Sequence, residues 1–348
     1  MKACVLHGIG DLRVEEVNTP SPAKSEVLIK IKASGVCGSD ISRVFTKGTY
    51  HFPTIPGHEF SGQIVAVGAG VSSTLIGKKA AVFPLIPCMK CDACQIGEYA
   101  QCSDYNYFGS RCDGGFAEYI SVPSWNLVIV PESLSYEEAA MAEPAAVAVH
   151  ALRQAGIEIG DKVVIYGAGT IGLMLGQWAL AWGADQVMLV DIDKAKIAFA
   201  KELGFENVWN STTGDPVEWI KEITGGRGAD LAIEGAGVSS TLEQCLKCVR
   251  PFGKVVAMGN PIGDMKLSQK AYWELLRKQL KIVGTWNSSY ISLPKNDWVL
   301  AVRAMEQKKI NVKSFITHRF PLNMSIEALE IMKNKSEFYN KIMFIMEE

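Results

Sequence analysis

Long apolar runs and a strong net charge are the two features that this sequence most clearly lacks. No uninterrupted apolar segment reaches the roughly 18 residues that a membrane-spanning helix needs, because Glu143 and Pro144 interrupt segment 139–152 and Gln177 interrupts segment 171–184. The formal net charge of −2 argues against a nucleic acid or an anionic membrane as the main partner. The first residues are too polar, and too few, to read as a signal peptide, so we expect a cytoplasmic protein.

Length, hydrophobic content and cysteine number limit the remaining possibilities. The chain has 348 residues, about twice the size of a typical domain, which predicts two domains. Hydrophobic residues make up 48% of the sequence, which supports large cores and excludes a disordered protein. Nine cysteines fit a cytoplasmic protein if they bind metal and do not form disulfides.

The N-terminal part of the chain is typical of a mainly antiparallel β domain. Residues 1–35 alternate apolar and polar side chains, and segment 60–83 continues this pattern. Several glycines in the second segment suit the tight corners of a small barrel.

Cys37 and His58 are candidate zinc ligands, and both lie beside glycines that let the backbone approach closely. A catalytic zinc needs three protein ligands and one open position, and we propose Glu143 as the third. Either residue alone would usually be a core or surface side chain. A second metal motif and a dinucleotide fingerprint in the same chain favour the metal interpretation.

Four further cysteines form the most specific local pattern, Cys88-x2-Cys91-x2-Cys94-x7-Cys102. Four closely spaced thiolates make a closed tetrahedral zinc site, which has a structural and not a catalytic role. The alternative is an iron–sulfur cluster, whose bacterial spacing places the fourth cysteine after three residues and before a proline. The gap here is seven residues and Ser103 follows, so zinc is favoured for segment 88–102.

Cys245 and Cys248 also form a Cys-x-x-Cys pair, but segment 241–250 reads as a helix and no second pair is nearby. Buried free thiols are the better interpretation.

From about residue 155 the pattern changes to alternating strands and helices. A buried strand at 162–166 leads directly into Gly167-x-Gly169-x-x-Gly172, a helix follows at 173–182, and the next strand ends on Asp191. Placed between strand and helix, with an acid 19 residues after Gly172, these glycines predict a dinucleotide site at a helix N-terminus. Asp191 would accept the ribose hydroxyls and repel a 2′-phosphate, which favours NAD over NADP.

The alternation of strands and helices continues along the chain and predicts six strands in total, as in a doubly wound sheet. Glycines 237 and 259 follow two strand ends at the carboxyl edge, where such sheets bind ligands. The candidate cofactor-binding residues are therefore Gly167, Gly169, Thr170, Ile171, Gly172, Asp191, Gly237 and Gly259. We predict a zinc domain at 1–154, an NAD-binding domain at 155–286, and a segment 287–348 that returns to the first domain.

Taken together, these motifs resemble the zinc-dependent medium-chain dehydrogenases over essentially the whole chain. The elements that carry the resemblance, in family order, are Cys37-Gly38-Ser39-Asp40, Gly57-His58-Glu59, the four-cysteine segment, Glu143-Pro144 and the fingerprint 167–172. Glu143-Pro144 is similar to the polyol dehydrogenase branch, where glutamate replaces a cysteine ligand. Segments 84–88, 109–119 and 284–287 resemble members that oxidise a hexitol phosphate.

The resemblance implies a GroES-like β-barrel catalytic domain beside a Rossmann coenzyme domain, two zinc ions and NAD per chain, and a homodimer or homotetramer. It implies that a secondary alcohol is oxidised at the zinc, and that Ser39 accepts the hydroxyl proton. Glu59 would ligate or orient the metal, or pair with a buried base. The sequence lacks the histidine that many members carry just after this Ser-Asp pair, so the proton must leave by another path.

The resemblance implies that the substrate is a small polyol or a polyol phosphate. A phosphate would need cationic partners, for which Arg43, Lys47 and Arg111 are the candidates. Arg43 and Lys47 would share a helix face, which could equally be a solvated basic surface. Two alternatives stay open: a dehydrogenase of an unphosphorylated polyol or diol, and an NAD-binding scaffold without activity. Retention of Cys37, Ser39, His58 and Glu143 argues against the scaffold.

Overall fold

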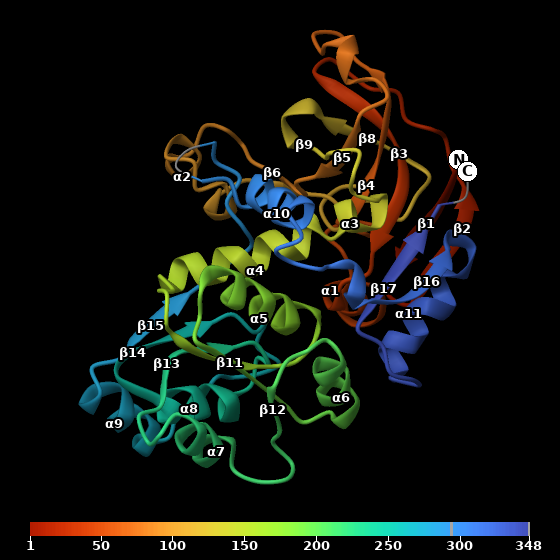
Figure 1. The fold of residues 1–348 in the computed structure, drawn as a ribbon. Helices are drawn as coiled ribbons and strands as arrows, with labels where there is room; N and C mark the ends of the chain where they lie inside the picture. Colours follow the sequence, from red (N-terminus) through yellow and green to blue (C-terminus); the bar gives the residue numbers. More distant parts are fainter. Residues whose placement is uncertain (293–294, 347–348) are drawn as a thin grey trace. The chain divides into compact units, whose positions relative to one another are not determined.

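The computed structural model describes residues 1–292 and 295–346. The chain divides into two compact units, shown in Figure 1. Unit 1 comprises Met1–Ala146 and Ser289–Glu348, and unit 2 comprises Val147–Ser288. The division into domains at residues 154 and 286 stays a prediction; the first of these positions lies inside helix α4 (Ala142–Ala155). No helix among the described residues is both long and apolar enough to cross a membrane.

Unit 1 is built around a seven-stranded sheet in the order β16-β17-β3-β4-β5-β9, with β8 paired to β3. All its pairings are antiparallel except β16 with β17. The strands are β3 (Glu26–Gly35), β4 (Glu59–Val67), β5 (Lys79–Val82), β8 (Tyr119–Pro123), β9 (Leu127–Ile129), β16 (Ile316–Pro321) and β17 (Lys341–Ile345). Two small sheets add β1 (Lys2–Gly8) with β2 (Asp11–Glu16), and β6 (Leu85–Ile86) with β7 (Asn106–Tyr107).

The core of unit 1 follows from the alternation predicted for its strands. In β3, buried side chains alternate with partly exposed ones along most of the strand, as a half-buried sheet requires. Phe116 packs edge-on against Phe344 of β17, with ring centroids 4.8 Å apart. The helices of this unit are α1 (Gly38–Ser42), α2 (Asp92–Gln95), α3 (Tyr136–Ala140), the start of α4, α10 (Asp297–Glu306) and α11 (Ser325–Asn334), with a π-helix at Arg43–Lys47.

Unit 2 contains one parallel sheet of six strands in the order β12-β11-β10-β13-β14-β15. This is the strand order of the dinucleotide-binding doubly wound fold. The strands are β10 (Lys162–Tyr166), β11 (Gln186–Asp191), β12 (Asn207–Asn210), β13 (Ala229–Glu234), β14 (Val249–Ala257) and β15 (Lys281–Gly284). The helices that alternate with them in Figure 1 are α5 (Thr170–Trp182), α6 (Lys194–Glu202), α7 (Pro216–Ile223), α8 (Ser239–Cys248) and α9 (Gln269–Arg277).

The predicted fold class is confirmed: a mainly antiparallel GroES-like part and a Rossmann-type parallel sheet. Cys245 and Cys248 are free, fully buried cysteines in the core of unit 2, as the helix interpretation of their segment predicted. Burial raises the pKa of Cys248 to about 12, so this thiol is neutral at physiological pH.

Candidate metal centres and coenzyme site

The four cysteines of segment 88–102 converge on one point. Their sulfur atoms all lie within 4.8 Å of one another, and the Cys88 and Cys94 sulfurs are 4.0 Å apart. Zinc–sulfur bonds of about 2.3 Å at tetrahedral angles place sulfurs about 3.8 Å apart. Amides of Ser103 and Cys94 lower the pKa of Cys91 to about 6, whereas burial raises that of Cys94 to about 12. The cluster therefore fits a closed tetrahedral zinc.

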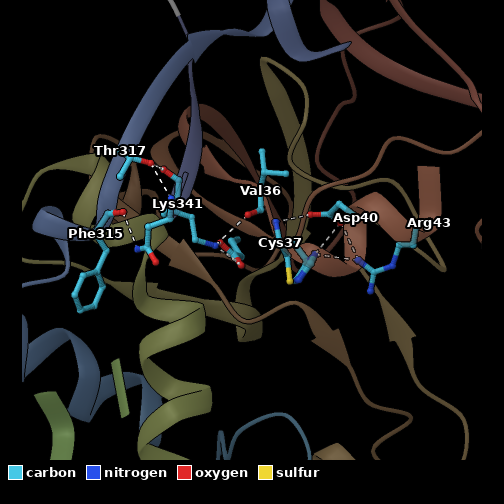
Figure 2. A network of polar contacts seen from close by, with 10 residues as sticks. Val36, Cys37, Asp40, Arg43, Phe315, Thr317 and Lys341 are labelled. Carbon is cyan, nitrogen blue, oxygen red and sulfur yellow. Dashed lines mark hydrogen bonds and ion pairs between the residues drawn. The ribbon is translucent and has the colours of Figure 1, made fainter. Parts of the chain in front are cut away.

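A second cluster joins Cys37 to His58. Helix α1 begins directly after Cys37, whose amide donates to Asp40 Oδ2 at 2.9 Å. His58 precedes β4, and its Nδ1 lies 3.3 Å from Asp40 Oδ1. Arg43 Nη1 bonds the same carboxylate at 2.8 Å and contacts His58 Nδ1 at 3.2 Å. Figure 2 shows Asp40 between Cys37 and Arg43. With its proton on Nδ1, the imidazole donates to Asp40 and leaves Nε2 for a metal.

Asp40 is charged, and it keeps the imidazole in place. Burial alone would raise the pKa of Asp40, but His58 and Arg43 outweigh it and lower this pKa to about 2. Burial alone would likewise lower the pKa of His58, but Asp40 raises it well above the ordinary value. Asp40 and His58 thus form a buried ion pair, and the imidazole would have to lose a proton to ligate a metal.

Two carboxylates compete for the third ligand position. The geometry groups Glu59 with Cys37 and His58, with ligand atoms within 4.8 Å of one another, and leaves Glu143 outside that group. Both oxygens of Glu59, however, accept from Lys341 Nζ, at 2.9 and 2.6 Å. Both side chains are almost fully buried, so the Glu59 charge is already balanced. Glu59 therefore pairs with a buried base, which is one of the two roles expected for it from the sequence.

Glu143 has no such partner. It lies in the first turn of α4, the helix that begins just after α3 ends, and it is 7% exposed. Among the described residues, none forms a hydrogen bond or ion pair with its carboxylate. Burial raises its pKa to about 7, with Glu59 adding to the rise and His58 opposing it. A buried carboxylate that forms no direct ion pair with a described residue fits a metal-ligand position better than a structural one. Its role as ligand stays a prediction.

Ser39 supplies a second unsatisfied group at this site. Its Oγ is buried and has no hydrogen-bond partner among the described atoms. A buried hydroxyl normally finds a partner, and its absence leaves a donor and acceptor available to an incoming alcohol. Helix α1 fixes Ser39 two residues after Cys37.

Three residues of this pocket were missed from the sequence. Asp40 was named only as part of the Cys37–Asp40 motif, without a role, although it lies in the first turn of a short helix. Lys341 lies 282 residues from Glu59, so no local pattern links them. Tyr107 is half-buried, with its ring centroid 5.8 Å from that of His58. Burial and the nearby Glu143 raise its pKa well above the ordinary value, so its hydroxyl stays protonated.

The three candidate phosphate contacts have different surroundings. Arg43 is engaged with Asp40 and His58. Lys47 is exposed at the end of the π-helix. Arg111 lies against the rings of Tyr50 and Tyr105.

The candidate coenzyme loop connects β10 to α5. Gly167 has a φ of +109°, which other residues avoid. A Cβ at Gly172 would lie 1.8 Å from the Gly167 carbonyl oxygen, so only glycine allows this close turn. Gly169 is the N-cap of α5, and Thr170 and Ile171 open the helix, so their amides face the site of a bound phosphate.

Asp191, at the end of β11, holds this loop in place through a hydrogen bond to its backbone. Its carboxylate accepts from the amides of Ala168, at 2.8 Å, and Asp193, at 2.9 Å. Lys196 lies 3.8 Å from it. These contacts use part of the acceptor capacity of the carboxylate and leave lone pairs for ribose hydroxyls.

Gly237 and Gly259 lie against each other after β13 and β14. A Cβ at Gly259 would lie 2.3 Å from the Gly237 nitrogen, and one at Gly237 would lie 2.0 Å from the Asn260 oxygen. Glu234, which is 1% exposed, accepts from the Gly237 amide at 2.8 Å and from Thr241 Oγ1 at 2.7 Å. The sequence analysis missed Glu234, which fixes these two loops.

Comparison with known proteins identifies the family of this chain. The zinc-binding dehydrogenase family matches residues 170–307, and the alcohol dehydrogenase GroES-like domain matches residues 23–132. The chain is 37% identical to galactitol 1-phosphate 5-dehydrogenase of Escherichia coli (strain K12), over 96% of this chain and 97% of the relative. It is 31% identical to sorbitol dehydrogenase of Bacillus subtilis (strain 168), over 99% and 96%.

A crystal structure of galactitol-1-phosphate dehydrogenase from Escherichia coli superimposes with a TM-score of 0.93 at 35% identity. The superposition covers 99% of this chain and 100% of that one. The predicted cofactors, zinc and NAD, agree with these matches and with the cysteine cluster. The chain belongs to the zinc-dependent medium-chain alcohol and polyol dehydrogenases.

Proposed function

We propose that this dehydrogenase oxidises galactitol 1-phosphate to tagatose 6-phosphate and transfers the hydride to NAD. The buried Glu143 carboxylate, which interacts electrostatically with His58, carries the catalytic part of this proposal. The substrate is supported by the extent of the match to galactitol 1-phosphate 5-dehydrogenase. We assign unit 1 as the zinc-binding part and unit 2 as the coenzyme-binding part.

Cys37, His58 and Glu143 hold the catalytic zinc in this scheme, and the four cysteines of segment 88–102 hold the structural one. A bound zinc supplies Lewis acidity, which lowers the pKa of an alcohol. Asp40 holds the His58 ring in orientation, and Arg43 holds Asp40. Glu59 stays paired with Lys341 in this scheme and is not a zinc ligand. It is the first residue of β4 and directly follows His58.

Ser39 is the proton acceptor. Its free Oγ takes a hydrogen bond from the substrate hydroxyl, and the proton leaves through Ser39 to water. Tyr107, whose hydroxyl stays protonated, adds a neutral wall to the pocket beside His58.

NAD is the hydride acceptor. The amides at the start of α5 bind its pyrophosphate, and Asp191 binds the adenosine ribose. A 2′-phosphate would meet the Asp191 carboxylate, which favours NAD over NADP.

NADH formation by the zinc-loaded protein tests this function, with galactitol 1-phosphate, galactitol, sorbitol and butane-2,3-diol compared at equal concentrations. We expect the highest kcat/KM for galactitol 1-phosphate. A preference for sorbitol would favour the second candidate, an unphosphorylated-polyol dehydrogenase, which the sorbitol dehydrogenase relatives support. Absence of turnover on every polyol, with both metals bound, would contradict both candidates.

A further inference from the structure

Arg111 is held by aromatic rings and has no acidic partner. Its guanidinium carbon lies 4.1 Å from the ring centroid of Tyr50 and 4.4 Å from that of Tyr105. It donates to Tyr50 Oη at 3.2 Å and to the Tyr105 carbonyl oxygen at 3.3 Å. A guanidinium has five N–H donors, so most of them stay available. No carboxylate pairs with Arg111 in the described part of the chain.

His51 fixes the backbone behind this guanidinium. Its Nε2 lies 3.1 Å from the Arg111 carbonyl oxygen, and its Nδ1 lies 3.1 Å from the Pro53 carbonyl oxygen. The segment that carries Tyr50 is thereby tied to the loop that carries Arg111. The two tyrosines and the tether order a flexible side chain before any ligand arrives, which lowers the entropy cost of binding.

A cavity of about 550 Å³ opens beside Arg111. It is lined by Tyr50, Ile86, Cys88, Lys90, Asp104, Tyr105, Asn106 and Arg111. Lys90 lies between two ligands of the predicted structural zinc, and its ammonium has no ion-pair partner among the described residues. Asp104 is the one carboxylate of this lining, and it forms no ion pair with either cation. The lining therefore carries more positive than negative charge.

Arg43 is unsuited to the phosphate for two reasons. Its charge is balanced by Asp40 at 2.8 Å, so a phosphate would have to displace a buried ion pair. It also contacts His58 directly, at 3.2 Å. In a hexitol 1-phosphate oxidised at C5, four carbon–carbon bonds of about 1.5 Å each separate the reacting carbon from the ester carbon. The phosphate must therefore lie away from the zinc ligands.

Arg111 is linked to the metal site by a series of ring contacts. The Tyr107 ring contacts His58, and the Tyr105 and Tyr107 centroids are 6.4 Å apart. Tyr105 in turn contacts Arg111. A row of aromatic side chains thus leads from the imidazole to the guanidinium, all within unit 1. Aromatic faces suit the C–H surface of a polyol chain between the two ends.

We propose that Arg111 and Lys90 form the subsite that binds the phosphate of the substrate, and that Arg43 serves only to position Asp40 and His58. This inference rests on the proposed function. Arg111 makes the charge-assisted, two-point contact and Lys90 adds a single charge. The subsite favours a phosphate ester over the neutral polyol, because the polyol has no negative group to bind the two cations.

Direct binding tests the subsite without turnover. The probes are inorganic phosphate and galactitol 1-phosphate, titrated calorimetrically against the zinc-loaded protein without NAD. The variants are Arg111→Gln, Lys90→Gln, Arg43→Gln and, as a matched surface control, Lys24→Gln. We expect Arg111→Gln to weaken both probes about ten- to a hundred-fold, Lys90→Gln to weaken them by less, and the Lys24 variant to have no effect. Arg43→Gln should leave inorganic phosphate binding unchanged and lower kcat on every substrate.

Two results would overturn the subsite: unchanged phosphate binding in both the Arg111 and Lys90 variants, or loss of phosphate binding in the Arg43 variant alone. The kinetics of the wild type distinguish an incorrect subsite from an incorrect substrate assignment. If the wild type binds inorganic phosphate through Arg111 but oxidises galactitol as well as its phosphate, the subsite stands and the substrate assignment falls. If the wild type prefers the phosphate ester and the variants retain that preference, the substrate stands and the subsite falls.

Discussion

Lys341→Met should be among the most destabilising single changes in unit 1. Lys341 lies at the start of β17, is 4% exposed, and donates to both oxygens of Glu59 and to the Val36 carbonyl oxygen at 3.1 Å. Burial opposes its charge, but Glu59 and Cys37 raise its pKa above the ordinary value. Methionine has a similar volume and leaves the Glu59 carboxylate charged and buried without a counterion. Breaking such a pair costs about 3–5 kcal/mol.

Urea unfolding of the wild type and of Lys341→Met gives this loss, and Lys24→Met is the matched surface control. The double variant Glu59→Gln/Lys341→Met removes the stranded charge and should recover most of the stability. The series should be run with zinc bound and after chelation. If Lys341 balances Glu59, the loss should be similar in both states. A loss below about 1 kcal/mol in the zinc-loaded protein and a large one after chelation would show that Glu59 is a zinc ligand, and would refute the pairing.

Three further changes test other parts of the structure. Cys102→Ser should lower the zinc content by one ion per chain and expose segment 88–102 to proteases. Gly172→Ala would place a Cβ 1.8 Å from a loop carbonyl oxygen, so NADH affinity measured by fluorescence should fall, whereas Gly284→Ala, with open space around it, should not change it. Glu243 has its pKa lowered to about 2 by Lys247 and a backbone amide. Its folded pKa is below the unfolded one, so its stabilisation, about 1 kcal/mol after solvent screening, is present above about pH 4.5 and lost toward pH 2. The urea midpoints of Glu243→Gln and wild type should therefore converge as the pH falls.

Local patterns predicted most of the fold and the metal-binding residue types. The spacing of Cys88, Cys91, Cys94 and Cys102 predicts a metal cluster within one short segment. The glycines at 167–172 indicate a tight turn that other residues could not form. The continuous apolar runs of β10, β11 and β13 located the central parallel strands, because these strands are buried on both faces. These signals depend on neighbours along the chain and need no knowledge of tertiary contacts.

The features that the sequence did not reveal all depend on long-range contacts. Lys341 reaches Glu59 because β17 pairs with β3, next to β4, and that pairing is set by the whole sheet. The different roles of Arg43 and Arg111 also depend on long-range contacts. Both were candidate phosphate contacts, but Arg43 pairs with the buried Asp40, whereas Arg111 lies against two tyrosine rings. The partners of a charged side chain, and not its type, determine whether it can bind a ligand.

Zinc content and NADH formation of the wild type and of His58→Ala, measured on the same preparations, test the central claim most directly. The wild type should hold two zinc ions per chain and reduce NAD with a polyol substrate. His58→Ala should keep the four-cysteine zinc, lose the other, and show no turnover while its circular dichroism stays unchanged. Two zinc ions and normal turnover in His58→Ala would contradict the assignment of the catalytic centre.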